Sequence, residues 1–193
     1  MPWALPETLP LVTLRTGTTI ARIHRSSSAE PFFGPKHGDS PSQRFHDPLN
    51  AFGVCFLGED VSTSFVETFL RNPPVRLITR TEVASRRLTT FRCIRDVHLV
   101  KLSDEGLALI GCTADVTSNA PPHGAPQELS RALWTHPGQP DGIRYRCRHD
   151  NGLHAIALYD RAAGVLEPLR SEDLLSDRAR LLAWRSRYGF EIA

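Results

Sequence analysis

The sequence has no segment typical of secretion or of membrane insertion. Its first residues, Met1–Glu7, lack both the basic start and the apolar core of a secretory signal. No stretch of the chain approaches the roughly 20 consecutive apolar residues that a membrane-spanning helix needs. We therefore expect a cytoplasmic protein that does not bind a membrane.

Cysteine and histidine occur without the spacings of a metal site. The four cysteines form no Cys-x-x-Cys pair, and the eight histidines form no His-x-x-Glu-His motif and no Cys/His cluster. Wide separation of the cysteines also fits reduced thiols better than a disulfide framework. The sequence therefore predicts free cysteines, no metal and no prosthetic group. These cysteines are Cys55, Cys93, Cys112 and Cys147.

The chain has no large excess of charge of either sign. Its 23 Lys and Arg residues and 21 Asp and Glu residues give a formal net charge of +2 at pH 7, without a basic tract. Nucleic-acid binding would require a broad positive surface, which this balance does not favour. Any anion site must be local, and we expect a small anionic ligand.

Internal repeats and low-complexity segments are absent as well. A length of 193 residues, 40% of them hydrophobic and 23% charged, is typical of one globular domain, which we expect to span residues 1–193. Residue patterns predict strands at 18–24, 53–57, 142–149 and 155–159. They predict two or three more strands between 75 and 102, the clearest at 96–102. They predict helices at 61–71, 104–110, 127–134 and 172–188, with Asp60 and Ser171 as caps and Gly189 as a terminator. Loops are expected at 1–14, 26–50 and 114–126.

Arginine alternates with other residues in the predicted strand at 142–149. Arg144, Arg146 and Arg148 would share one face, opposite Tyr145 and Cys147. Such a face could bind an anion. It could also be the solvated outer face of an edge strand, where cations hinder aggregation.

Glu67 lies on the polar side of the predicted helix 61–71. At roughly 100° per residue, Val61, Phe65, Val66, Phe69 and Leu70 form one apolar arc, and Glu67 lies about 150° from its centre. Glu67 therefore faces away from the core. It is either a solvated glutamate or a functional carboxylate.

Several of these segments together resemble the RES domain family. They are the strand with Arg22, the loop ending at 43–45, the strand–helix unit from 54 to 67, the helix segment 132–134, and the strands at 141–148 and 157–161. Their order and spacing are similar to the family's over about residues 18–168, followed by the helix at 172–188. The resemblance implies an α+β, mono-ADP-ribosyltransferase-like fold with mixed β-sheets and peripheral helices.

The resemblance also implies an activity. RES proteins are named for an arginine, a glutamate and a serine; here Arg22 and Glu67 match the first two, and Cys147 stands where the serine is expected. Family members are toxins that cleave the nicotinamide–ribose bond of NAD⁺ with phosphate or water as acceptor. They are usually paired with an Xre-type antitoxin. NAD⁺ is then the substrate, and phosphate a co-substrate.

The residue chemistry agrees with this activity. Arg22 and Arg44 can bind phosphate oxygens through charge-assisted hydrogen bonds, and Glu67 can stabilise the oxocarbenium-like charge that develops as nicotinamide leaves. Cys147 can contact the nucleotide, or be a buried small apolar residue. Four more residues are candidates for stacking on the bases, with surface exposure or core packing as the alternatives: His24, Phe45, His46 and Tyr145.

Other functions stay open at this stage. The acceptor could be a protein, which would make the chain a protein mono-ADP-ribosyltransferase. Because Cys147 replaces the serine, the chain could also be a catalytically silent module that binds NAD⁺ or a partner. The C-terminal helix is apolar and arginine-rich, and could form an interface between copies of the chain.

Overall fold

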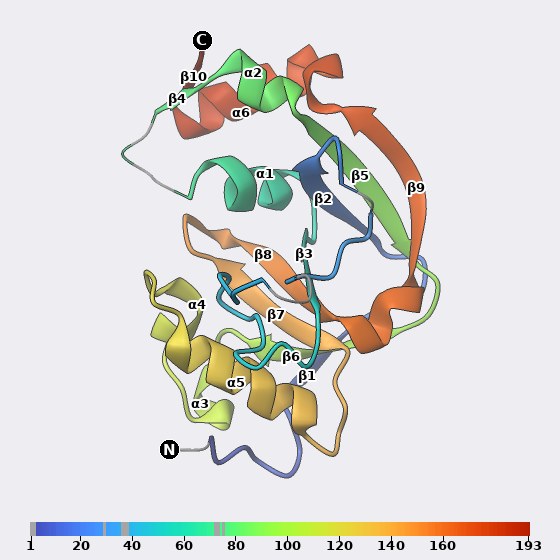
Figure 1. The fold of residues 1–193 in the computed structure, drawn as a ribbon, viewed down its shortest axis with the longest axis vertical. Helices are drawn as coiled ribbons and strands as arrows, with labels where there is room; N and C mark the ends of the chain where they lie inside the picture. The colour runs from blue at the N-terminus through green and yellow to red at the C-terminus, as the bar shows by residue number, and fades with distance from the viewer. Residues whose placement is uncertain (1–2, 29, 36–38, 72–73, 75) are drawn as a thin grey trace.

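A computed structural model describes residues 3–28, 30–35, 39–71, 74 and 76–193 (Figure 1). Within these residues an eight-stranded sheet dominates the fold, and only its β6–β7 pair is parallel. Its strands, in spatial order, are β1 (Leu11–Leu14), β6 (Val97–Leu102), β7 (Gly142–Cys147), β8 (Asp150–Tyr159), β3 (Val54–Gly58), β2 (Thr19–Arg25), β5 (Arg86–Cys93) and β9 (Leu166–Asp173). A small parallel pair is formed by β4 (Leu77–Ile78) and β10 (Glu191–Ile192).

Helices lie around this sheet, as Figure 1 shows. They are α1 (Val61–Phe69), α2 (Arg80–Ala84), α3 (Glu105–Ile110), α4 (Asp115–Ser118), α5 (Gly124–Thr135) and α6 (Arg178–Tyr188), with 3₁₀ turns η1 (Asp160–Val165) and η2 (Leu174–Ser176). In Figure 1, α1 lies between the β7–β8 hairpin and the α2–α6 pair, and α5 covers the opposite end of the molecule. The α+β class with mixed sheets and peripheral helices is confirmed.

The predicted start of the C-terminal helix and its predicted cap, Ser171, are wrong. Residues 172 and 173 belong to β9, where Ser171 pairs with Thr89 of β5, and do not start a helix. Helix α6 begins later, and its cap is Asp177, whose Oδ1 accepts a hydrogen bond from the backbone N–H of Arg180 at 2.9 Å. Pairing with a distant strand has overridden the local helix signal. The predicted end at Gly189 is confirmed by its φ of 64°.

Three predicted segments contain more structure than expected. Residues 11–14 form β1, because they pair with β6 of the main sheet. Helix α2 lies between β4 and β5, and α4 and the first turn of α5 lie in the predicted loop 114–126. These elements are short, so their sequence patterns are weak. Parts of the predicted segments 1–14, 26–50 and 75–102 lie outside the described residues.

The sheet separates two apolar clusters, as strand alternation requires. In β2, Ala21 and Ile23 face the larger cluster and Ile20 faces the smaller one. Helix α1 packs on the larger cluster through Phe65, whose ring stacks on Trp184 of α6 at 4.4 Å between centroids.

Helix α1 lies very close to the end of β3. A Cβ added to Gly58 would lie 2.6 Å from the backbone oxygen of Asp60 and 2.7 Å from the backbone nitrogen of Ser64. Only glycine fits this approach. Asp60 then caps the helix, as predicted, because its Oδ1 accepts a hydrogen bond from Thr63 N–H at 2.7 Å.

Strands β2 and β3 separate almost as soon as they meet. They pair at one position, Ala21 with Gly58, whereas β2 pairs with β5 at seven positions and β3 with β8 at five. The sheet is therefore open beside Arg22 and Phe56.

Candidate active site

Two adjoining cavities lie beside α1. The larger, about 330 Å³, is lined by residues that include Arg22, His46 and Arg86. The smaller, about 210 Å³, is lined by residues that include Arg44 and Arg148. Together these volumes fall in the range of about 300–1,000 Å³ that is typical of small-molecule sites. The residues that line both cavities are Gln43, Phe56, Glu67, Arg71 and Tyr145.

Arg22 occupies the opening between β2 and β3. Its Nη1 donates a hydrogen bond to the backbone oxygen of Phe56 at 2.7 Å, where a neighbouring strand would otherwise pair. Its Nε lies 2.8 Å from Glu30 Oε2. That contact is an ion pair and not an aligned hydrogen bond, because the Nε–H does not point at the oxygen. Arg22 is thus fixed on two edges at the wall of the larger cavity.

Glu67 faces the cavities, as expected from its place off the apolar arc of α1. It is half-buried, and the described part of the chain provides no ion pair to its carboxylate. Among the described residues that line the two cavities, it is also the only carboxylate. The site therefore contains one negative side chain among several arginines.

Cys147 is fully buried and lies against Glu67. Burial is the main cause that raises the pKa of its thiol far above the ordinary value, and the charge of Glu67 and a hydrogen bond to Glu67 add to this effect. The thiol is therefore protonated and donates to the carboxylate. A protonated thiol is a poor nucleophile, which argues against a covalent intermediate on this residue.

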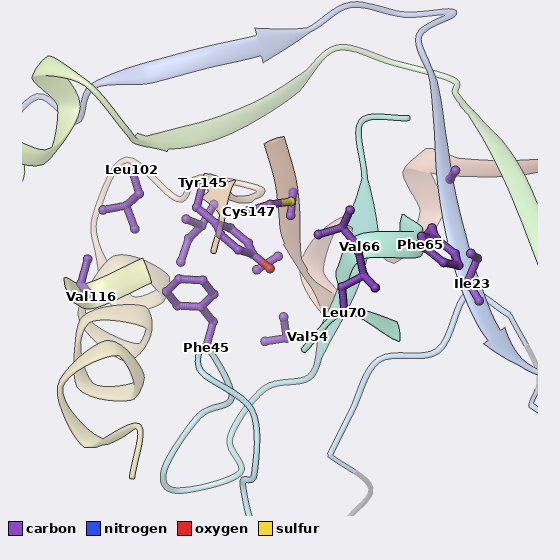
Figure 2. Close-up of a cluster of buried hydrophobic side chains, with 14 of the residues drawn as sticks. Ile23, Phe45, Val54, Phe65, Val66, Leu70, Leu102, Val116, Tyr145 and Cys147 are labelled. Carbon is purple, nitrogen blue, oxygen red and sulfur yellow. The ribbon is translucent and has the colours of Figure 1, made fainter. Parts of the chain in front are cut away.

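Tyr145 reaches the cavities, and Phe45 does not. Tyr145 is 2% exposed, yet it lines both cavities. Phe45 packs edge-on against the Tyr145 ring, at 5.0 Å between centroids, within the core cluster that also holds Val66 (Figure 2). Core packing therefore describes Phe45, and of these two aromatic residues base stacking remains a proposal for Tyr145.

The smaller cavity is rich in cations. Arg44 is anchored by Nη2, which donates to the backbone oxygen of Asn119 at 3.2 Å, and burial lowers the pKa of its guanidinium. Arg71 donates from Nη2 to Gln43 Oε1 at 2.8 Å. With Arg148 on the same wall, these side chains suit an anionic ligand.

The arginine face predicted for residues 142–149 is not an open anion site. Arg144 forms an ion pair with Glu59, and Arg146 Nη2 lies 2.8 Å from Asp104 Oδ1. Arg148 is not on this face, because β7 ends at Cys147 and the ladder shifts between residues 146 and 147. Arg148 lines the smaller cavity instead.

The two candidate histidines lie in different places. His24 is buried outside the two cavity walls, and its Nε2 lies 2.8 Å from Thr89 Oγ1. His46 lines the larger cavity, with its ring 5.7 Å from that of Phe56. Of these two histidines, a stacking role is therefore retained as a proposal for His46 and not for His24.

Burial of His46 should make stability depend on pH. Burial lowers the pKa of His46 to about 4, compared with about 6.5 in the unfolded chain. Between these values the unfolded state binds more protons, so the free energy of unfolding falls as the pH falls. Between pH 7 and pH 5 we expect a loss of about 2 kcal/mol that His46→Gln removes, measured by urea unfolding of ligand-free protein. Equal pH dependence in both proteins would contradict this expectation.

Several cavity residues were missed from the sequence. Gln43 and Arg71 line both cavities, and Arg86 lines the larger one. Arg71 is four residues after Glu67, which places it on the same side of α1 just past the helix end, so helical spacing could have found it. No local signal marks Arg86, which comes from β5.

Comparisons with known proteins bear on the family and the fold of this chain. The family model described as RES domain matches residues 19–185. The protein "Probable toxin y4kH" of Sinorhizobium fredii (strain NBRC 101917 / NGR234) is 34% identical over 94 residues, which cover 49% of this chain and 72% of that protein. A chain in the crystal structure of the M. tuberculosis MbcT–MbcA toxin–antitoxin complex has a TM-score of 0.69 at 16% identity, covering 90% of this chain and 92% of that chain.

The described residues contain neither a metal-binding cluster of side chains nor a helix suited to a membrane. No group of three or more His, Cys, Asp or Glu side chains is placed to hold a metal ion. None of the helices described is both long and apolar enough to cross a membrane.

Proposed function

This chain belongs to the RES domain family, and from that premise we propose that it cleaves the nicotinamide–ribose bond of NAD⁺. Glu67 carries this proposal, because it is a lone carboxylate on the shared wall of two cavities lined by arginines. NAD⁺ needs the same combination, since cations can hold its diphosphate and a carboxylate can act at its ribose.

Each group then has a defined task. Glu67 binds the ribose hydroxyls and stabilises the positive charge that develops at C1′ as the bond to nicotinamide breaks. Nicotinamide leaves as a neutral molecule and takes the bonding electron pair, so no general acid is required. Arg22 and Arg44 lie on the walls of different cavities, so they can bind different parts of one extended dinucleotide.

We propose phosphate as the preferred acceptor and water as the second. A phosphate nucleophile is itself an anion and needs a cation beside the ribose. Arg71 supports this choice, because it lines both cavities together with Glu67. An oxygen of phosphate or water would form the new bond at C1′ after nicotinamide departs, and water would release its extra proton to solvent.

The direct test is to incubate the pure protein with NAD⁺, with and without phosphate, and to measure free nicotinamide. Release that increases with phosphate supports phosphorolysis, and release that does not depend on phosphate supports hydrolysis. ADP-ribose attached to a protein would support a protein mono-ADP-ribosyltransferase. Binding of NAD⁺ without release of nicotinamide would contradict the proposed catalysis. It would indicate a catalytically silent module that binds NAD⁺.

We also propose that the chain is a toxin held inactive by an antitoxin protein. Support comes from two relatives, one named a probable toxin and the other solved in a toxin–antitoxin complex. The family resemblance adds that the antitoxin is of the Xre type. Co-expression of the neighbouring gene product, followed by co-purification and loss of nicotinamide release, would test this partnership.

Replacing Cys147 with serine should keep or raise the turnover of NAD⁺. A hydroxyl is a better hydrogen-bond donor than a thiol, so the serine would hold Glu67 more firmly. Cys112→Ser is the matched control, because Cys112 lies outside both cavity walls. Steady-state nicotinamide release measures the effect. Loss of activity in a folded Cys147→Ser protein would show that the sulfur has a role of its own.

A further inference from the structure

A buried carboxylate outside the family motif lies beside Arg22. The side chain of Glu30 is 6% exposed, and its Oε2 lies 2.8 Å from Arg22 Nε. The same oxygen accepts a hydrogen bond from the backbone N–H of Phe32 at 3.2 Å. Glu30 therefore holds one edge of an arginine that lines the larger cavity.

The three nitrogens of the Arg22 guanidinium have different surroundings. Nε faces Glu30, and Nη1 donates to the backbone oxygen of Phe56. Among the residues that the structure describes, Nη2 has no recorded protein partner. Because the guanidinium is planar, fixing Nε and Nη1 also fixes the direction of Nη2. Nη2 is thus the donor left for a ligand in the cavity.

Stability alone does not explain Glu30. Its Oε1 is buried and has no hydrogen-bond partner among the described residues. His24 Nδ1 lies 3.6 Å away, but that nitrogen also lies 2.9 Å from the backbone oxygen of Arg25. A half-satisfied buried carboxylate destabilises a fold, and a buried ion pair contributes little stability.

Neutral His24 cannot supply the missing charge. Burial is the main cause that lowers its pKa, and the charges of Arg22 and Arg87 lower it further, against the opposing effects of the hydrogen bond to the backbone of Arg25 and of the charge of Glu30. The positive charge that balances Glu30 is therefore that of Arg22.

We propose that Glu30 is a positioning residue, which orients the Arg22 guanidinium so that Nη2 points at an oxygen of the substrate. This inference rests on the proposed function. It makes a prediction opposite to that of simple electrostatics. Removing a negative charge beside a binding arginine should strengthen the attraction of an anionic substrate, whereas loss of orientation should weaken productive binding.

The test measures kcat and KM for nicotinamide release from NAD⁺ in wild type and in Glu30→Gln. We expect kcat/KM to fall by about 10- to 100-fold. Glu167→Gln is the matched control, because Glu167 also pairs with an arginine, Arg92, but at an exposed position of β9. In an Arg22→Ala background, Glu30→Gln should cause no further loss, because the two residues act through one group.

A second measurement does not depend on NAD⁺. The Nε–H signal of Arg22, assigned by its absence in Arg22→Ala, should be sharp in wild type, where the ion pair with Glu30 and the hydrogen bond to Phe56 restrain the guanidinium, and should shift or broaden in Glu30→Gln. If wild type releases no nicotinamide, the proposed function fails and this signal alone decides the positioning role. If Glu30→Gln does not fold, Glu30→Asp replaces it, with a smaller loss expected.

Three results would overturn the positioning role. They are an unchanged or higher kcat/KM in Glu30→Gln, a further loss in the Arg22→Ala background, and an unchanged Nε–H signal.

Discussion

Replacing Glu67 with glutamine is expected to lower NAD⁺ turnover by about 100-fold or more and to leave NAD⁺ binding largely intact. The amide keeps the size and much of the hydrogen bonding of the carboxylate, but it has no charge. The positive charge at the ribose develops mainly in the transition state, so the loss should appear in kcat rather than in KM. Nicotinamide release gives both constants, and calorimetry with NAD⁺ gives the affinity.

Glu105→Gln is the control for Glu67→Gln. Glu105 is an exposed carboxylate near the start of α3, paired with Lys101 at 2.7 Å, and it lies outside both cavity walls. It should keep wild-type activity. Full turnover in Glu67→Gln would remove the oxocarbenium role from this residue, and weaker binding with unchanged kcat would make Glu67 a substrate-binding residue only.

Replacing Arg22 with alanine should damage binding and turnover together. Loss of one charge-assisted hydrogen bond, about 1.5–3 kcal/mol, weakens NAD⁺ binding by about 10- to 150-fold. The change also leaves Glu30 buried without its partner, which should lower the free energy of unfolding by about 3–5 kcal/mol. Calorimetry and urea unfolding measure the two effects separately.

A double variant separates these two consequences of losing Arg22. Arg22→Ala with Glu30→Gln removes the unpaired charge, so it should recover part of the stability and none of the binding. Arg92→Ala is the surface control, since its ion pair with Glu167 is about half exposed. Recovery of NAD⁺ binding in the double variant would show that Arg22 acts on the fold and not on the ligand.

The elements with strong local patterns were predictable from the sequence. The apolar arc of α1 and the cap at Asp60 predicted the helix. The same periodicity predicted that the Glu67 side chain faces away from the apolar arc. The β-branched run of β2 gave the strand that carries Arg22. The RES resemblance singled out Arg22, Arg44 and Glu67, and the structure places all three on the walls of the two adjoining cavities.

The unpredicted parts depend on contacts between distant residues. Nothing near Glu30 in the chain shows that it is buried, because its partner Arg22 reaches it through an opening that exists only when β2 and β3 diverge. The register of β7 against β8 shifts between Arg146 and Cys147, and Arg148 then lines the smaller cavity. This shift depends on the pairing with β8. Local alternation could not reveal either feature.

The single pairing between β2 and β3 divides the sheet into two hydrogen-bonded halves. One half contains β1, β6, β7, β8 and β3, and the other contains β2, β5 and β9. Arg22 belongs to the second half and Tyr145 to the first. A ligand that contacts both residues therefore links the two halves across the β2–β3 boundary. Such a ligand would oppose local separation of the two halves, and substrate occupancy and resistance to local unfolding would then rise together.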